Sequence, residues 1–443
     1  MTLRLLLVRH GLSSFNLERR IQGRNDLSTL TDDGKQQAIK TGRALSSLPI
    51  NAVYSSPLQR AAATTSHLLE ELKQEQKPIF DQGLLEVELG QWSGMTAAEV
   101  KDDFPEIYQT WKTHPEEVVL TRSNGTKFKP IQELIKQAKD FLGRVIKHHS
   151  PEGNETILIV AHNAILRCII LQLLGQPKQG FRRIQLDNAS ISVFNLKPSI
   201  MKPYQVQLEC LNSSTHLNTT IPKKNNCARL ILVRHGETNW NLEGRFQGQI
   251  DIPLNNNGKE QAAAAGSFLS SLHIDKAFSS SMSRPRETAE AILTFHPDIK
   301  IKLLKGLVEI GHGLWEGKLE SEIKEEWSEL LETWQNQPER VQMPQGENIQ
   351  TVWSRSVASW KQICSNLTSR ETALVVAHDA VNKTILCHLL GLSPSDIWTI
   401  KQGNGCVSII DISNEPSQPD VVTCLNLTSH IGGVLDCTAS GAL

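Results

Sequence analysis

The stretch Leu5-Leu6-Leu7-Val8-Arg9-His10-Gly11 decides the fold predicted for this chain. A short apolar run of this kind is typical of a buried β-strand, and this one carries an arginine and a histidine to its carboxyl end. The glycine that follows allows a turn or a close approach of the backbone to a ligand. Because open α/β sheets place ligand sites at the carboxyl ends of their strands, the stretch predicts both a sheet and a site.

The same pattern returns as Leu230-Ile231-Leu232-Val233-Arg234-His235-Gly236, and the similarity continues in the same order along the chain. Four further segments match between the two copies, with small insertions where loops tolerate them. The matched segments are 16–23 with 241–248, 55–60 with 279–284, 85–94 with 308–317, and 159–164 with 375–380. A repeat of this length predicts two copies of one domain and not a solenoid.

The domain boundaries follow from the last matched strand of each copy. A chain of 443 residues is long enough for two domains. We expect a first domain over 1–217, a polar linker containing Pro222 over 218–227, and a second domain over 228–435. The stretch from Gly432 onward is small and polar, so we expect it to be frayed, with a tail over 436–443.

Composition limits the classes of partner. The net charge of −1 gives no electrostatic basis for binding nucleic acid or an anionic membrane, so the expected partner is a small metabolite. The eight cysteines lack metal-ligand spacing and are expected to be reduced thiols packed in cores. Arg9 and His10 interrupt the N-terminal apolar run too early for a signal peptide, and no segment reaches the length of a membrane span. A cytoplasmic location is expected.

Short apolar runs alternate with helical patterns inside each copy. Strands are expected over 51–55 and 157–161, and helices over 32–48 with Thr31 as N-cap, 58–72 and 164–174. This alternation predicts an α/β fold: two tandem three-layer α/β/α domains, each a mostly parallel sheet with helices on both faces. The helical stretches 96–118 and 320–337 lie between strands and predict a small helical cap in each domain.

The residues at the strand ends predict the chemistry. Each copy supplies two histidines, two arginines and one glutamate, which together could form a pocket of the size of a phosphate group. A neutral imidazole nitrogen could attack phosphorus, and a carboxyl group could protonate the leaving oxygen and later deprotonate water. Arginine and imidazolium would neutralise the phosphate oxygens, so no metal and no cofactor are expected.

The motifs that carry these residues resemble those of the histidine phosphatase superfamily, phosphoglycerate mutase-like branch. They are Leu-Val-Arg-His-Gly, Ser-Ser-Pro-Leu-x-Arg, a glutamate four residues before Gly-x-Trp-x-Gly, and Val-Ala-His. Segments 20–23 and 28–31 are also similar to those of members acting on carboxyarabinitol phosphates, and a likeness to α-ribazole phosphatase-type members is noted.

The resemblance implies a role for each matched residue. It implies His10 and His235 as nucleophiles that form phosphohistidine, with Glu86 and Glu309 as the proton donors. The implied phosphate and substrate ligands are Arg9, Asn16, Gln22, Gly23, Arg60 and His162 in the first domain, and Arg234, Asn241, Gln247, Gly248, Arg284 and His378 in the second. The implied activity is metal-independent hydrolysis of small phosphomonoesters such as sugar or sugar-acid phosphates.

Within the segments that resemble the family motifs, the first copy departs from the second at two places. Leu12 stands in the first copy where the second has Glu237, and the second copy alone has Pro344-Gln345-Gly346-Glu347. Two alternatives therefore stay open. One is a phosphoglycerate mutase-type transferase, which would share every core residue. The other is that one domain, the first in particular, is a non-catalytic phosphate-binding or regulatory module.

Several residues are expected to have structural roles. Trp92 and Trp315 are expected to pack in cores, and the pair His148-His149 to be solvated. The remaining histidines outside the motifs are expected to be structural, and these include His114, His216, His273, His296, His312, His388 and His430.

Overall fold

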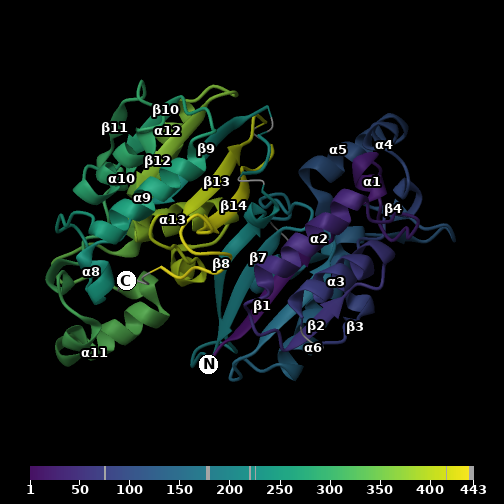
Figure 1. The fold of residues 1–443 in the computed structure, drawn as a ribbon, viewed down its shortest axis with the longest axis horizontal. Coiled ribbons are helices and arrows are strands. Elements are labelled where there is room, and N and C mark those ends of the chain that lie inside the picture. The colour runs from purple at the N-terminus through teal and green to yellow at the C-terminus, as the bar shows by residue number, and fades with distance from the viewer. Residues whose placement is uncertain (74–75, 176–179, 219–220, 225, 416, 439–443) are drawn as a thin grey trace. The chain divides into compact units, whose positions relative to one another are not determined.

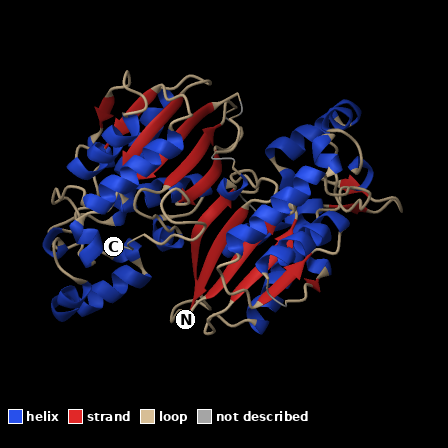
Figure 2. Ribbon diagram, viewed as in Figure 1, coloured by secondary structure: helices blue, strands red, loops and turns tan. Residues whose placement is uncertain are grey.

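The structure, a computed structural model, describes residues 1–443 except 74–75, 176–179, 219–220, 225, 416 and 439–443. The chain divides into two compact units. The first is mainly Met1–Val206 with Leu211–Pro222, and the second mainly Lys223–Asn414 with Pro419–Leu443. The passage from one unit to the next thus falls between Pro222 and Lys223. Both units combine helices with a central group of strands (Figure 2).

The sheet of the first unit is parallel at its centre. Its strand order is β8 (Gln205–Ser213), β7 (Ile191–Lys197), β1 (Leu3–Arg9), β6 (Thr156–Ala161), β2 (Ala52–Ser55) and β3 (Ile79–Phe80). Strands β1, β6, β2 and β3 run parallel, whereas β7 pairs antiparallel with β1. β6 is buried along its whole length, as expected of a strand covered by helices on both faces.

The helices of the first unit begin and end close to the predicted residues. α2 (Asp32–Leu45) is capped by Thr31, whose side-chain oxygen accepts a hydrogen bond from the Gly34 N–H at 3.0 Å. α2 packs against α3 (Gln59–Leu72), and the two lie side by side in Figure 1; α6 (Pro130–His148) packs against α7 (Asn163–Leu173). The predicted α/β fold with helix layers on the sheet is confirmed.

The second unit repeats this plan. Its strand order is β11 (Ile301–Leu303), β10 (Lys276–Ser279), β12 (Thr372–Ala377), β9 (Ala228–Arg234), β13 (Val407–Ile412) and β14 (Val421–Leu427). The first four are parallel, and β13 pairs antiparallel with β9. α9 (Asn256–Leu269) packs on α10 (Ser283–Leu293), and α12 (Ile349–Ser365) on α13 (Asp379–Leu390).

Small elements complete each unit near the predicted caps. The first unit adds α1 (Ser14–Leu17), α4 (Ala97–Asp103), α5 (Pro105–Thr113) and the two-stranded ribbon β4 (Leu120–Thr121) with β5 (Lys127–Phe128). The second adds α8 (Asn239–Glu243) and α11 (Glu320–Asn336). Trp92 and Trp315 are fully buried, as predicted; the Trp92 ring meets the Trp111 ring of α5 edge-on at 5.9 Å.

The glycine after the first strand is required by close packing. A Cβ atom on Gly11 would lie 2.4 Å from the carbonyl oxygen of Gly34, in the first turn of α2. Gly236 meets Gly258 of α9 in the same way, at 2.3 Å. In each unit, a pair of glycines allows the end of the first strand to touch the start of the long helix that follows. The close contact fixes the position of the histidine that precedes the first glycine of the pair.

Two structural expectations are wrong. His149 is not solvated but buried, because its ring bonds to the Tyr54 hydroxyl at 3.1 Å and to the Glu155 carboxylate at 3.0 Å. The C-terminal stretch is not frayed over its described part, because the Asn404 N–H donates to the Thr438 hydroxyl at 3.0 Å. Residues 439–443 of the expected tail lie outside the described residues. All eight cysteines are free thiols, and five are buried.

Candidate active sites

His10 follows the last residue of β1, and its ring is fixed by the backbone. Nδ1 lies 2.8 Å from the carbonyl oxygen of Gly11. Since a carbonyl oxygen only accepts, Nδ1 carries the proton and Nε2 keeps its lone pair. Burial, and then the positive charges of Arg9 and Arg60, hold the pKa of His10 well below its ordinary value. The ring is therefore a neutral imidazole with a free nucleophilic nitrogen.

Arg9 and Arg60 are oriented by backbone carbonyl groups. Arg60, in the first turn of α3, donates to the carbonyl oxygens of Gly23 at 2.8 Å and Asn25 at 3.0 Å. Arg9 donates to the carbonyl oxygen of Leu186 at 2.8 Å. The Nε atoms of both arginines are buried and have no hydrogen-bond partner among the described residues. Both guanidinium groups thus keep donors for an anion that binds beside His10.

His162 lies next to the nucleophile. Its ring centroid is 5.1 Å from that of His10, and its Nε2 bonds to the Ser56 hydroxyl at 2.7 Å. Nδ1 is buried and has no partner within the described part of the chain. Burial and the charge of Arg60 lower the pKa of His162 well below its ordinary value. The two histidines and two arginines predicted from the motifs therefore converge on one point.

Glu86 lies in a loop, and its carboxylate contacts the N-terminal turn of α7 beside the cavity. Its carboxylate accepts hydrogen bonds from the N–H groups of Val87 at 2.9 Å, Ala164 at 3.1 Å and Ile165 at 3.2 Å. The N–H groups of Ala164 and Ile165 belong to the first turn of α7, whose positive end favours a carboxylate there. The group is thus held where it can exchange a proton with a molecule bound near His10.

A cavity of about 240 Å³ opens in front of His10. It is lined by Arg9, His10, Asn16, Arg20, Gln22, Gly23, Arg60, Glu86, Val87, Leu89, Trp111, Asn163, Ala164, Arg167, Phe181 and Arg182. All the predicted site residues of the first domain line it except His162, whose ring lies next to that of His10. The polar lining suits a small anionic molecule.

The second unit holds the same arrangement around His235. Nδ1 of His235 lies 2.7 Å from the Gly236 carbonyl oxygen, and Nε2 accepts a hydrogen bond from Arg284 Nε at 3.2 Å. Burial and the charges of Arg284 and Arg234 hold the pKa of His235 well below its ordinary value. The ring of His378 lies 5.2 Å away and bonds to the Ser280 hydroxyl at 2.9 Å.

The arginines and the glutamate of the second site also match. Arg284 donates to the Gly248 carbonyl oxygen at 2.9 Å, and Arg234 to that of Gln402 at 2.6 Å. Glu309 accepts from the N–H groups of Ile310 at 3.0 Å and Ala380 at 3.4 Å. Burial, and then the charge of Asp379, raise the pKa of Glu309. This carboxyl group can therefore hold a proton at a higher pH than an ordinary glutamate.

The expected substrate-entrance residues have unequal roles. Asn16 lines the cavity and accepts the Ser13 hydroxyl at 2.9 Å, and Gln22 accepts the same hydroxyl at 3.1 Å. In the second site Asn241 accepts the Thr238 hydroxyl at 3.2 Å, whereas Gln247 donates its Nε2–H to the Thr238 hydroxyl oxygen at 2.5 Å. Gly23 and Gly248 hold Arg60 and Arg284 through their carbonyl oxygens, and both have positive φ angles. The glycines thus orient the phosphate-binding arginines.

An asparagine pair was missed by the sequence analysis. Asn188 Nδ2 donates to the carbonyl oxygens of His10 at 3.0 Å and Gly11 at 3.2 Å, and to Asn16 Oδ1 at 3.1 Å. Asn404 bonds to His235 and Asn241 in the second site. Each asparagine stands three residues before a strand, β7 in the first copy and β13 in the second, and this repeated position could have identified them. They fix the loop that carries each nucleophile.

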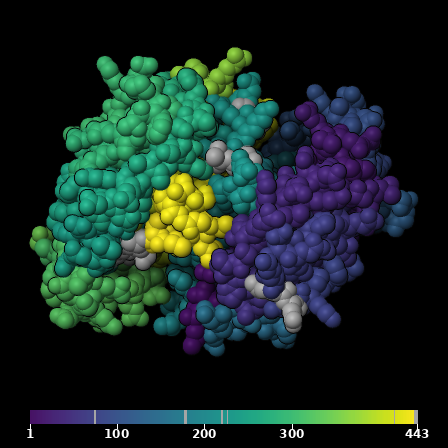
Figure 3. All heavy atoms as spheres, viewed as in Figure 1, coloured from purple at the N-terminus to yellow at the C-terminus, as the bar shows by residue number. Residues whose placement is uncertain are grey.

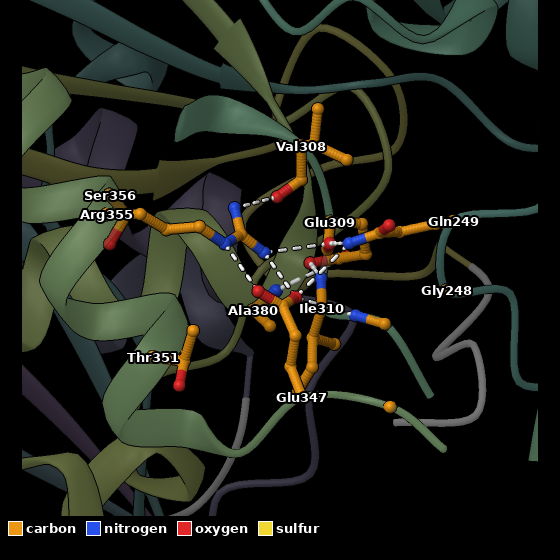
Figure 4. A network of polar contacts seen from close by, with 12 residues as sticks. Gly248, Gln249, Val308, Glu309, Ile310, Glu347, Thr351, Arg355, Ser356 and Ala380 are labelled. Carbon is orange, nitrogen blue, oxygen red and sulfur yellow. Dashed lines mark hydrogen bonds and ion pairs between the residues drawn. The ribbon is translucent and has the colours of Figure 1, made fainter. Parts of the chain in front are cut away.

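The loops that carry Glu86 and Glu309, here called the acid loops, are held in place by different residues in the two sites. In the second, Arg355 donates to the carbonyl oxygens of Val308 and Glu309 and pairs with Glu347 at 2.8 Å (Figure 4). Glu347 also accepts the Gly311 N–H at 2.9 Å. The Pro-Gln-Gly-Glu segment of the second copy thus braces the loop that holds Glu309.

In the first site, Arg24 and Gln137 support the loop that carries Glu86. Arg24 donates to the carbonyl oxygen of Glu86 at 3.0 Å and to Gln137 Oε1 at 2.9 Å. Gln137 in turn donates to the Leu85 carbonyl oxygen at 2.7 Å. Glu88 of the same loop lies 3.9 Å from Arg24 and pairs with Arg122 at 2.9 Å, so the loop is braced by residues other than those of the second site.

The Leu12 difference also has a structural explanation. Glu237 accepts a hydrogen bond from Asn255 Nδ2 at 2.8 Å, and Asn255 is the N-cap residue of α9. In the first unit Thr31 caps α2 and donates its hydroxyl hydrogen to the Leu12 carbonyl oxygen at 3.0 Å. The glutamate thus supports a helix start, and the leucine removes none of the groups around His10.

The residues that bind metals in proteins do not cluster here. Within the described residues, no group of three or more histidine, cysteine, aspartate or glutamate side chains is placed to hold a metal ion. A search of the same residues finds no helix whose length and apolarity would let it cross a membrane.

Comparison with known proteins identifies the class. Residues 5–203 and 230–424 match the family model of the histidine phosphatase superfamily, branch 1. The chain belongs to this superfamily, with two copies of its domain, and is a phosphoric monoester hydrolase.

Some of its relatives match nearly the whole chain, and others match about half of it. It is 26% identical to 2-carboxy-D-arabinitol-1-phosphatase of Triticum aestivum, over 97% of this chain and 86% of that protein. It is 32% identical to phosphoserine phosphatase 1 of Hydrogenobacter thermophilus, over 46% of this chain and 94% of that protein. Among solved structures, the α-ribazole phosphatase of Shigella flexneri matches 48% of this chain and 99% of its own, with 25% identity and a TM-score of 0.41.

Proposed function

We propose that the protein hydrolyses small phosphomonoesters, of the sugar or sugar-acid phosphate type, through phosphohistidine intermediates on His10 and His235. The observation that carries the proposal is the tautomer of the two rings. In each, Nδ1 donates to the next backbone carbonyl group, so Nε2 offers its lone pair beside a buried arginine. A neutral imidazole in a cationic pocket is suited to attack a phosphate group.

The first step transfers the phosphoryl group to the enzyme. Nε2 of the histidine forms a bond to phosphorus while the ester P–O bond breaks, and the leaving oxygen takes the proton of Glu86 or Glu309. The raised pKa of Glu309 supports its protonated form before this step. The bound phosphoryl group is held by the arginine pair and by the second histidine of each site.

The second step releases phosphate. The glutamate, now ionised, removes a proton from water; the water oxygen bonds to phosphorus, and the N–P bond breaks to restore the neutral imidazole. The products are an alcohol and inorganic phosphate, and the glutamate is protonated again. All groups in this cycle are side chains of the protein, so chelators should not affect the rate.

We propose that both domains are active. The main reason to doubt the first was the loss of Glu237 and Glu347 counterparts. Glu237 supports the start of α9, and Arg24 with Gln137 braces the loop of Glu86 in place of Arg355 with Glu347. The alternative, a first domain that binds phosphate without hydrolysis, predicts no phosphohistidine on His10.

The test is to trap the intermediates. The full chain is mixed with an aryl phosphate, quenched in base and analysed by peptide mass spectrometry, with His10→Ala and His235→Ala as controls. We expect a phosphorylated histidine at both positions, each lost in its own variant, and unchanged turnover in EDTA. Labelling of neither histidine would contradict the mechanism, and labelling of His235 alone would make the first domain a binding module. Isomerised phosphoglycerate without free phosphate would indicate the mutase-type transferase.

A further inference from the structure

The cavity of the first site contains two arginines that the phosphate chemistry does not use. Arg167, on α7, donates to the Phe181 carbonyl oxygen at 2.9 Å, and its guanidinium lies 5.4 Å from the centre of the Phe181 ring. Arg182 donates to the carbonyl oxygen of Trp111 and lies 5.4 Å from the centre of its ring. Both line the same cavity as His10. Aromatic rings and carbonyl groups thus hold two guanidinium groups toward one space.

Among the described residues, neither Arg167 nor Arg182 forms an ion pair with a carboxylate. Glu86 acts on Arg167 and Glu116 on Arg182 only at longer range, and the Nε atoms of both arginines are buried without hydrogen-bond partners. Burial, together with the nearby charges of Arg182 and Arg9, lowers the pKa of Arg167 to about 9. Both side chains are half-buried. A guanidinium group that is partly removed from water without a nearby counter-ion is costly, and an anion from solution would offset that cost.

In the second site, other residues of the chain occupy the corresponding positions. Asp379 and Lys383 occupy the places of Asn163 and Arg167, and they pair with each other at 2.6 Å. Asp379 also lies 3.7 Å from Arg234. Trp398 occupies the place of Arg182 and donates to the Trp334 carbonyl oxygen at 2.9 Å, as Arg182 does to Trp111. One copy thus carries its own carboxylate where the other has two unpaired arginines.

We infer that Arg167 and Arg182 form a subsite for a carboxylate group of the substrate, so that the first site selects phosphorylated carboxylic acids and the second does not. The inference rests on the proposed function and adds the substrate class of one site. Arg20 also lines the cavity, but its charge is met by Glu18 at 2.7 Å.

The second site indicates which anion fits this place. There the carboxylate of Asp379 lies 2.6 Å from the Lys383 ammonium group and 3.7 Å from Arg234. These two residues stand where the first site has Arg167 and Arg9. A carboxylate of the substrate would take the same place in the first site. The planar carboxylate also fits the forked donors of a guanidinium group.

The test compares two substrates that differ only at the second group. 3-Phosphoglycerate has a carboxylate where glycerol 3-phosphate has a CH₂OH group. In the full chain with His235→Ala, which leaves only the first site, we expect kcat/KM to favour 3-phosphoglycerate at least about tenfold, as for a charged hydrogen bond. With His10→Ala, which leaves only the second site, we expect a ratio near one. Equal rates for both substrates at the first site would overturn the subsite.

Variants of the subsite sharpen the result. Arg167→Gln and Arg182→Gln, each in the His235→Ala chain, should lower kcat/KM for 3-phosphoglycerate about 10–100-fold more than for glycerol 3-phosphate. Asn163→Asp, which copies Asp379, should do the same. Arg43→Gln, which breaks an exposed pair with Glu71, should leave the ratio unchanged. An equal fall for both substrates would show that Arg167 and Arg182 only support the fold, and would overturn the inference.

Binding separates this inference from the proposed function. Calorimetry with the doubly inactive His10→Ala, His235→Ala chain measures the affinity for both compounds without turnover. Tighter binding of 3-phosphoglycerate that is lost with Arg167→Gln supports the subsite even if no phosphohistidine forms. Tighter binding of glycerol 1,3-bisphosphate than of 3-phosphoglycerate would assign the arginines to a second phosphate. Equal binding of all three compounds would overturn the subsite.

Discussion

Arg284 Nε donates a hydrogen bond to Nε2 of His235 across 3.2 Å, so the phosphate-binding arginine touches the atom proposed to attack phosphorus. The contact favours the neutral imidazole, because Nε2 must offer its lone pair to accept the bond. When substrate binds, a phosphate oxygen would accept this hydrogen bond from Arg284 in place of Nε2. The carbonyl oxygens of Gly248 and Ile250 hold the other end of the guanidinium.

Arg284→Gln removes a donor that faces the developing charge of the transferring phosphoryl group. We expect kcat/KM of the second site toward an aryl phosphate to fall about 10²–10³-fold, the usual cost of losing one such donor. The measurement uses the His10→Ala chain, in which only the second site works. Arg286→Gln is the matched control, because this residue lies on the same helix in an exposed pair with Glu290. A loss of the same size in the control would assign the effect to the helix.

The pH dependence of the second site should follow Glu309 and not His235. The pKa of His235 lies well below 6.5, so acidification from pH 8 to 6.5 leaves the nucleophile unprotonated and should not slow the reaction. The pKa of Glu309 is raised above 4.5, so the acid form is lost as the pH rises through that raised value. We expect kcat in the His10→Ala chain to fall toward alkaline pH.

Glu309→Gln tests this assignment. It should remove the alkaline fall and lower turnover of an alkyl phosphate about 10²–10⁴-fold, while an aryl phosphate, whose leaving group needs less protonation, should lose less. An unchanged pH profile in Glu309→Gln would assign the proton transfer to another group.

The brace behind Glu309 should affect turnover without touching the substrate. Glu347→Gln weakens the pair with Arg355 that holds the carbonyl groups of Val308 and Glu309. We expect kcat of the second site to fall about tenfold with a small change in KM, since a misplaced acid slows the chemical step. Gln137→Ala, which changes the brace of the first site, should leave the second site unaffected. A change in KM alone would mean that Glu347 acts on substrate binding.

His312 should make folding stability depend on pH. It is fully buried, no described residue bonds to either ring nitrogen, and burial lowers its pKa to about 3. The unfolded chain binds a proton near pH 6.5 and the folded chain does not, so stability is present above pH 6.5 and is lost on acidification. The loss is about 2 kcal/mol at pH 5. Urea unfolding of His312→Phe should show a fall between pH 7 and pH 5 smaller by that amount. Equal falls in both proteins would contradict the prediction.

Local signals allowed much of the fold to be predicted. The apolar run of β1, the threonine cap of α2 and the helix patterns are each contained in a few adjacent residues. The repeat of the β1 pattern in the second copy strengthened the prediction. The site core followed because its residues stand beside glycines at strand ends in both copies. The buried position of His149 could not be predicted, because its partners Tyr54 and Glu155 come from other elements.

The arrangement of charged side chains around each site could not be predicted from the motifs either. Asp379 and Lys383 are four residues apart on a helix, a spacing that predicts a surface pair. Their burial beside Arg234 depends on how α13 meets β9, which no short segment contains. The asparagine that fixes each nucleophile loop is likewise defined only by the three-dimensional neighbourhood of His10 and His235.

The brace of each acid loop is built from residues of its own copy: Arg24 with Gln137 in one, Arg355 with Glu347 in the other. A mutation in one brace would therefore move only one of the two acids, and the other domain would keep its reaction. The two acids can in this way be repositioned independently within one chain.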